Sequence, residues 1–233
     1  MVLAEARALT LEVYGTLIDW ETGIADALAP WARAHGVMAS RAALLDAVAA
    51  AERARLDAHP ELPYPAVLEH VFDDLCARFG VRPAPDAAEA FADSIGDWPA
   101  FPDSAAALGE LARRYKLAAI VNVDGASFAA SAKRLGTAFD VLVTAADAGA
   151  YKPDPAPFER ALADLSDLGV AVDEVLHTGR AWASDLEPAQ RLGLSTCRIV
   201  RPSLVSDAPP PAGAGPDLCF ASMADFAAAL GEA

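Results

Sequence analysis

Short apolar segments, several of them rich in β-branched residues, alternate along this chain with longer Ala-rich segments. Such runs bounded by turn residues predict buried strands, here at residues 8–13, 117–121, 141–144, 174–178 and 195–200. Helical patterns occupy most intervals between them, at residues 104–115, 126–135, 156–168 and 186–192. This alternation predicts an α/β protein with a Rossmann-like, doubly wound parallel sheet that is covered by helices on both faces.

One long interval departs from the alternation. From about residue 22 to about residue 97 only helical patterns occur, at residues 22–35, 41–58, 65–79 and 86–94. A helical insertion after the first strand can cover the carboxyl ends of the strands, where open α/β sheets bind ligands. We therefore expect an α/β core formed by residues 1–20 and 98–233 and a helical cap formed by residues 21–97. The Pro/Gly-rich residues 201–217 predict a surface loop before a last strand near 217–220 and a closing helix.

Composition limits the partners that we expect. The chain has 233 residues, of which 54% are hydrophobic, so it can bury a large core, and its formal net charge of −15 opposes binding to nucleic acid or an anionic membrane. We expect a small-molecule substrate and a cytoplasmic protein, because the sequence has neither a signal-peptide pattern nor a run of about 20 apolar residues. Cys76, Cys197 and Cys219 lack the spacing of a zinc site or a disulfide framework and are predicted to be core thiols.

The first predicted strand ends in an acid. Glu12 lies at the end of this apolar run, directly ahead of a Gly-Thr turn, in the stretch LEVYGTL. A carboxylate at such a position is costly to desolvate unless its surroundings use it. Glu12 is therefore the first candidate functional residue.

Four stretches carry a resemblance to a known family: LEVYGTL, IVNVDGASF, AGAYKPDPAPF and HTGRAWASDLEPAQRLGL. With the helical insertion after the first, they resemble the haloacid dehalogenase superfamily, specifically its type II 2-haloacid dehalogenase branch. The resemblance covers nearly the whole chain in order. It implies a hydrolase with a Rossmann-like core and a helical cap, and in this family such an insertion often supports a homodimer.

The resemblance places Glu12 at the position of the family's nucleophilic aspartate. Either acid can form a covalent ester, but one added methylene moves the carboxylate by about 1.5 Å, and a displacement of about 1 Å can cost on the order of 100-fold in rate. We therefore predict that Glu12 acts as nucleophile or general acid/base in a pocket rebuilt around the longer side chain.

Tyr14 stands where phosphatases of the superfamily carry a second aspartate, which protonates the leaving group and helps to bind magnesium. A tyrosine resembles the dehalogenase branch, so we expect no metal, no cofactor and no phosphatase activity. Tyr14 and Thr16 are candidate substrate-binding residues. The arginine that dehalogenases place early in the insertion has no counterpart; Arg33 comes later, as a solvated charge, while Trp20 and Trp31 either line the site or belong to the core.

The second stretch has Val121 and Asn122 where the family has Ser or Thr followed by Asn. Both are candidate substrate-binding residues. Valine offers no hydrogen-bond donor, so Val121 alternatively does no more than complete an apolar strand. Asn122 either binds the substrate, orients Glu12 or satisfies nearby backbone groups.

The third and fourth stretches supply Lys152 and Asp185, which the resemblance assigns with Glu12 to catalysis. The family's lysine neutralises and positions the nucleophile, so a pair between Lys152 and Glu12 would offset the desolvation of Glu12. Asp185 would orient the lysine or the hydrolytic water, or cap a helix that begins near residue 186. Arg180, a candidate substrate-binding residue, would clamp a carboxylate, pair with Asp185 or lie in solvent. His177 is expected to be a core histidine rather than a base.

The leading hypothesis is an enzyme derived from this hydrolase branch that acts without a metal on a small, carboxylate-bearing molecule. One alternative is a refashioned non-hydrolytic enzyme of secondary metabolism that catalyses cyclisation, hydration or isomerisation. The other is a non-catalytic binding protein on a degenerate fold. In each case Glu12, Asn122, Lys152 and Asp185 should converge at the carboxyl ends of adjacent strands beneath the insertion.

Overall fold

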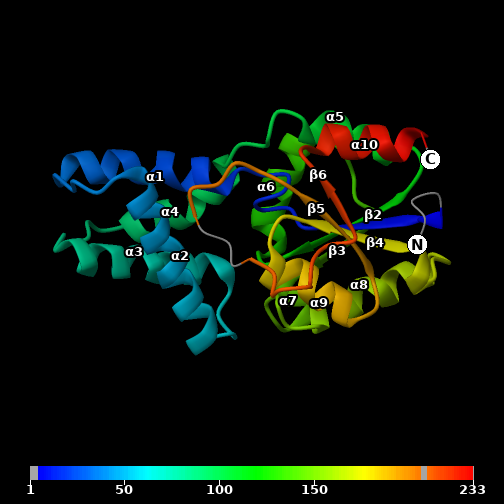
Figure 1. Ribbon diagram of the computed structural model, residues 1–233. Helices are drawn as coiled ribbons and strands as arrows, with labels where there is room; N and C mark the ends of the chain where they lie inside the picture. The colour runs from blue at the N-terminus through cyan, green and yellow to red at the C-terminus, as the bar shows by residue number, and fades with distance from the viewer. Residues whose placement is uncertain (1–4, 206–208, 233) are drawn as a thin grey trace.

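Six parallel strands form the centre of the molecule in the computed structural model, which describes residues 5–205 and 209–232 (Figure 1). Their order in the sheet is β3-β2-β1-β4-β5-β6. The doubly wound α/β fold predicted from the sequence is confirmed. The strands are β1 Ala8–Leu11, β2 Lys116–Val121, β3 Val141–Thr144, β4 Val175–Gly179, β5 Ser195–Ile199 and β6 Leu218–Phe220.

Helices cover both faces of this sheet because alternate side chains of the strands point to opposite faces. Leu117, Ala119 and Val121 belong to one core with α5, α6 and α10, whereas Ala118 and Ile120 belong to a second core with α8 and α9. Figure 1 shows α5 and α10 on one side of the sheet and α8 and α9 on the other. These helices, with the short α7, are α5 Ser104–Leu111, α6 Gly125–Leu135, α7 Ala145–Ala148, α8 Ala156–Asp167, α9 Glu187–Arg191 and α10 Met223–Glu232.

The interval that was predicted to be helical contains four α-helices and a short 3-10 helix. They gather at one end of the molecule, beside the sheet (Figure 1). The chain leaves and re-enters the sheet region through neighbouring segments, since Asp19 N donates to Pro99 O at 2.8 Å and Phe101 N to Leu17 O at 2.9 Å. The division into core and cap stays a prediction. The elements are α1 Trp20–Ala34, α2 Arg41–Ala58, α3 Tyr64–Phe79, α4 Ala87–Asp93 and the 3-10 helix Ser94–Asp97.

Several predicted boundaries were wrong by a few residues. The first strand ends at Leu11 because the carbonyl of Val13 accepts hydrogen bonds from Leu17 N and Ile18 N, which turns the chain. The predicted helix 104–115 ends at Leu111. Residues 206–208 of the predicted loop 201–217 lie outside the described residues.

Two other sequence expectations concern thiols and membranes. Cys76 and Cys197 are buried, as expected of core thiols, but Cys219 is exposed because it lies on β6 at the edge of the sheet. In the part of the chain that the structure describes, no helix is long and apolar enough to cross a membrane.

Candidate active site

Glu12 lies at the point where the sheet changes its winding direction. It follows β1, whose two neighbours in the sheet are β2 and β4, and its backbone N–H donates to Thr178 O on β4 at 2.9 Å. In doubly wound sheets the crevice at this position, outside the carboxyl ends of the strands, is the usual ligand site. The fold therefore brings Glu12 to the edge of the sheet at which a ligand is expected.

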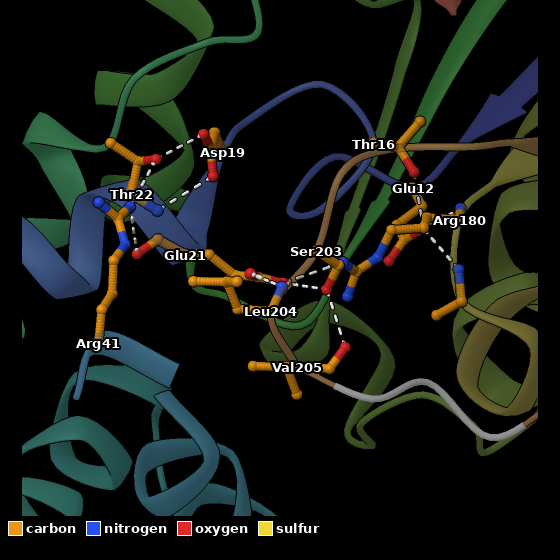
Figure 2. Close-up of polar contacts among 11 residues, drawn as sticks. Glu12, Thr16, Asp19, Glu21, Thr22, Arg41, Arg180, Ser203, Leu204 and Val205 are labelled. Atoms are coloured by element: carbon orange, nitrogen blue, oxygen red, sulfur yellow. Dashed lines mark hydrogen bonds and ion pairs between the residues drawn. The ribbon is translucent and has the colours of Figure 1, made fainter. Parts of the chain in front are cut away.

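The Glu12 carboxylate is buried and held by one of its two oxygen atoms. Oε2 accepts hydrogen bonds from Thr16 Oγ1 at 2.7 Å, from Arg180 N at 2.5 Å and from Ala181 N at 3.3 Å (Figure 2). No hydrogen bond from the described residues reaches Oε1. Arg180 N and Ala181 N directly follow β4. The pairing of β1 with β4 therefore determines the position of these donors relative to the Glu12 carboxylate.

Burial raises the pKa of Glu12 above its usual value, and the nearby charge of Asp185 raises it further. The charges of Lys152 and Arg180 and the hydrogen bond from Arg180 N act in the opposite direction. A carboxyl group whose pKa moves towards neutral pH is better suited to exchange protons during a reaction.

Glycine at position 179 gives Glu12 the space that it occupies. A Cβ added to Gly179 would lie 3.0 Å from Glu12 Oε2, 3.1 Å from Glu12 Cβ and 3.3 Å from Asp185 Cβ. Since real Cβ atoms rarely approach other atoms this closely, any side chain here would displace the acid. Gly179 was not identified from the sequence, because only the packing of the two strand ends reveals its role.

Lys152 and Asp185 form a buried ion pair next to Glu12. The lysine Nζ donates to Asp185 Oδ1, and the two side chains are 5% and 1% exposed. The predicted direct pair between Lys152 and Glu12 is not formed, because the ammonium group is engaged by Asp185; its charge still acts on Glu12 from a greater distance.

Asp185 lies inside a π-helical turn, Trp182–Leu186, that precedes α9. The prediction that it caps a helix was wrong: Leu186 is the N-cap of α9, and the Asp185 carboxylate bonds to Lys152 and to Ser184 Oγ, the latter at 2.6 Å. The turn is closed by a bond from Leu186 N to Ala181 O. Single π turns inside helices often occur at functional sites.

Val121 ends β2, and Asn122 follows it beside this pair. Asn122 Nδ2 donates to Lys152 O at 3.2 Å, and Lys152 N donates to Asn122 Oδ1 at 2.8 Å, so the amide holds the backbone of the lysine. Neither bond orients Glu12. Val121 is 1% exposed and completes the apolar strand.

Arg180 forms the second ion pair of the site, with Glu21 of α1. Arg180 Nη1 lies 3.1 Å from Glu21 Oε1, and the side chains are 12% and 8% exposed. The expectation that Arg180 pairs with Asp185 or lies free in solvent was wrong, because Glu21 reaches it from the insertion. Sequence reasoning missed Glu21; the only available signal was an acid in the first turn of a predicted helix.

Glu21 is also held by residues 201–205, a segment that we call the strap. Ser203 Oγ bonds to Glu21 Oε1, and Leu204 N donates to Glu21 Oε2 at 2.7 Å (Figure 2). At the other end of the strap, Arg201 Nε donates to Thr16 O at 2.9 Å. The strap thus contacts both the loop that carries Thr16 and the helix that carries Glu21.

The candidate substrate-binding residues of the first loop bond to the protein itself. Thr16 is fully buried and donates to Glu12. Tyr14 OH lies 2.9 Å from Ser131 Oγ, and burial raises the pKa of this phenol to about 12. Both residues therefore shape the surroundings of Glu12.

Four residues weighed as alternatives are also placed. His177 is a core residue: burial lowers its pKa to about 3, so its 3.8 Å approach to Asp185 is a contact of a neutral imidazole. Arg33 is exposed, and Trp31 packs against Phe72 in the insertion. Trp20 lies next to Gly15, beside Glu12.

A cavity of about 280 Å³ lies between the insertion and the sheet region. Residues 60–64 form one wall, and Val123 and Tyr151, which adjoin Asn122 and Lys152 in sequence, lie on the other; Glu12 does not line the cavity. Tyr151 OH donates to Leu62 O across it at 2.6 Å. A cavity of this size fits a small molecule.

Comparison with known proteins identifies the family. Residues 7–193 match the model of haloacid dehalogenase-like hydrolases, and the chain belongs to this family. The resemblance deduced from the sequence motifs is confirmed. A comparison with curated protein sequences finds no match.

Solved structures of L-2-haloacid dehalogenases share the fold over nearly the whole chain. The defluorinating enzyme Rha0230 has a TM-score of 0.82 and 26% identity, with 97% of this chain and 95% of that chain covered. The enzyme PA0810 has a TM-score of 0.82 and 24% identity over 98% and 100% of the two chains. The Xanthobacter autotrophicus enzyme with chloropropionic acid covalently bound has a TM-score of 0.76 and 20% identity over 96% and 97%.

Proposed function

We propose that this member of the family is an enzyme that acts on a small molecule without a metal ion, with Glu12 as its reacting carboxylate. The observation that carries the proposal is the difference between the two oxygen atoms of Glu12. Oε2 takes three hydrogen bonds from the protein, whereas Oε1 takes none from the described residues. A fixed carboxylate with one free oxygen can attack a carbon atom or accept a proton.

The side chains around Glu12 support metal independence. Magnesium prefers carboxylate and water oxygens, but Tyr14 supplies only a phenol that bonds to Ser131. The two oxygens of Asp185 are engaged by Lys152 and Ser184. Among the described residues, no group of three or more His, Cys, Asp or Glu side chains is placed to hold a metal ion.

Turnover of small electrophiles tests this proposal. We would follow chloride release from L-2-chloropropionate and 2-chloropropionamide, and product formation from a panel of small esters and epoxides, all with a chelator present. Glu12→Gln should abolish turnover. Glu12→Asp should lower it by about 100-fold, because the shorter side chain cannot reach the three donors to Oε2 and present Oε1 in the same place. Glu89→Gln, in the first turn of α4, is the control that should change nothing.

Full turnover by Glu12→Gln would contradict the role of Glu12. Magnesium-dependent phosphate release from a simple aryl phosphate would contradict the metal-independent chemistry. Each of these tests compares two proteins, or the presence and absence of magnesium, on the same compound. A contradicting result therefore cannot be explained by a poorly chosen substrate.

A non-hydrolytic reaction is the second candidate, and the ion pairs favour it. Lys152 and Arg180 are each paired with a protein carboxylate, so neither offers an unpaired positive charge to an anionic substrate or leaving group. Turnover in ¹⁸O-labelled water separates the two candidates. Hydrolysis places solvent oxygen in the product and releases a leaving group; hydration places the oxygen without a leaving group, and cyclisation or isomerisation places none.

A further inference from the structure

We propose that Glu21 sets the charge of the substrate. By pairing with Arg180, it makes the site select a neutral oxygen acceptor, such as a hydroxyl or an amide carbonyl, over a carboxylate. This inference rests on the proposed function, because it concerns the part of the substrate that lies beside Glu12. It replaces the carboxylate-bearing substrate that the sequence favoured.

The contacts of Glu21 hold it against Arg180. Its Oε1 lies 3.1 Å from Arg180 Nη1 and also contacts Ser203 Oγ, and its Oε2 accepts from Leu204 N at 2.7 Å. Figure 2 shows the Glu21 carboxylate facing both the strap and the guanidinium group of Arg180. With its side chain only 8% exposed, Glu21 is an intramolecular carboxylate that already pairs with the Arg180 guanidinium.

Arg180 keeps one donor for a ligand. Its Nε is buried and has no hydrogen-bond partner among the residues that the structure describes. A buried donor without a partner is unfavourable, and an ordered water or a ligand can supply the missing acceptor. The acceptor can be neutral, because the charge of the guanidinium is already balanced by Glu21.

This donor faces the free oxygen of Glu12 across Gly15. A Cβ added to Gly15 would lie 3.4 Å from Arg180 Nε, 3.4 Å from Trp20 Nε1 and 3.6 Å from Glu12 Oε1. Gly15 has a φ of +105°, which favours glycine, and the absence of a side chain leaves these three polar atoms facing one another. A substrate oxygen that accepts from Arg180 Nε therefore lies next to the reacting carboxylate.

Charge explains why this oxygen should be neutral. Glu12 and Glu21 are two acids beside one guanidinium, so an incoming carboxylate meets an excess negative charge at short range. A hydroxyl or amide accepts the same hydrogen bond without that repulsion.

Propionate and propionamide test the inference, because they share a shape and differ in charge. Binding would be followed by NMR through the indole N–H signals, which include that of Trp20. The wild type should bind propionamide more tightly than propionate. Glu21→Gln should raise the affinity for propionate by about 10- to 100-fold, the range expected for a hydrogen bond to a charged group, and should change propionamide affinity by less than about threefold.

Matched variants test whether the gain in propionate affinity depends on the pair of Arg180 and Glu21. Glu21→Asp keeps the charge and should keep the preference for propionamide, whereas Glu21→Gln combined with Arg180→Gln should lose the gain. Glu89→Gln should behave as the wild type, and Glu21→Ala is a second charge-removing variant if Glu21→Gln does not fold. The inference is overturned if removing the Glu21 charge does not raise propionate affinity, or if the gain survives without Arg180.

The inference about Glu21 is tested by binding, whereas the proposed function is tested by turnover. Failure of one can therefore be told from failure of the other. If Glu12→Gln remains fully active, the chemistry assigned to Glu12 is wrong but the selection by Glu21 can still be measured. If Glu21→Gln does not bind propionate more tightly, the selection is wrong while the loss of turnover in Glu12→Gln still stands.

Discussion

Two ion pairs flank Glu12, and they differ in what they connect. Lys152 and Asp185, 5% and 1% exposed, both belong to the segments that follow strands of the sheet. Arg180 and Glu21, 12% and 8% exposed, join the end of β4 to the first turn of α1, and the strap completes that contact. The first pair lies within the sheet region, whereas the second links the sheet region to the insertion.

The two ion pairs should therefore have different roles in the site. The pair of Lys152 and Asp185 is enclosed, and its two charges act on the pKa of Glu12 in opposite directions, so its loss should affect both folding and the proposed chemistry. The pair of Arg180 and Glu21 leaves a donor of Arg180 free beside Glu12, so its loss should change mainly what binds.

Breaking the enclosed pair should have the largest effect on stability. Lys152→Met leaves Asp185 buried without a cation, which should lower the free energy of unfolding by about 3–5 kcal/mol. Lys116→Met is the control, because it removes a pair whose side chains are 49% and 31% exposed and should cost less than about 1 kcal/mol. Equal losses in urea denaturation would show that the pair of Lys152 and Asp185 is not enclosed as described.

Filling the space at Gly179 should have the next largest effect. Gly179→Ala places a Cβ 3.0 Å from Glu12 Oε2, which should cost about 1–3 kcal/mol of stability by overpacking and should lower turnover by shifting the acid. Gly109→Ala is the control, since a Cβ there meets no atom within 4 Å. Normal turnover by Gly179→Ala would separate the position of Glu12 from the reaction.

Glu12 should make stability depend on pH. Because its pKa in the folded protein is raised above 4.5, the folded state binds the proton more tightly than the unfolded state, and ionisation of Glu12 lowers stability as the pH rises through that window. Glu12→Gln removes this contribution. The melting temperature of the variant relative to the wild type should therefore increase as the pH rises from 4.5, then level off; a decrease would indicate a lowered pKa.

Loosening the strap should have the smallest effect. Ser203→Ala removes one of the contacts to Glu21 but leaves the bond from Leu204 N. Stability should fall by less than about 1.5 kcal/mol, and the preference for propionamide should weaken by only about two- to threefold. A loss of preference as large as that of Glu21→Gln would mean that the strap, rather than the charge of Glu21, controls selection.

The sequence predicted the sheet and part of the site because those features have local signals. Alternating apolar runs revealed the strands, and the stretches around Lys152 and Asp185 resembled a known family. The partners of the charges had no such signal. Glu21 meets Ser203 across 182 positions of the chain, and the amides that hold Glu12 depend on the register between β1 and β4. Such contacts follow from packing, which no short pattern encodes.

The same limit explains the wrong pairings. Lys152 was expected to contact Glu12, and a contact with Asp185 was one of three alternatives for Arg180; Asp185 instead pairs with Lys152, and Glu21 with Arg180. The π-helical turn Trp182–Leu186 carries Asp185 towards Lys152, and α1 carries Glu21 towards Arg180. The spacing of these residues in the sequence does not reveal either contact.

Alkylation by 2-bromopropionamide tests most directly whether Glu12 carries the reacting oxygen. The reagent is neutral; attack by Oε1 forms a carbon–oxygen bond and expels bromide. The experiment would use a Cys219→Ser background, because Cys219 is the exposed thiol, and would locate the product by peptide mass spectrometry. We predict one ester adduct, on Glu12, in samples quenched with acid during the reaction, and none in Glu12→Gln. An adduct on Asp185, or labelling spread over exposed carboxylates with Glu12 unmodified, would contradict the account.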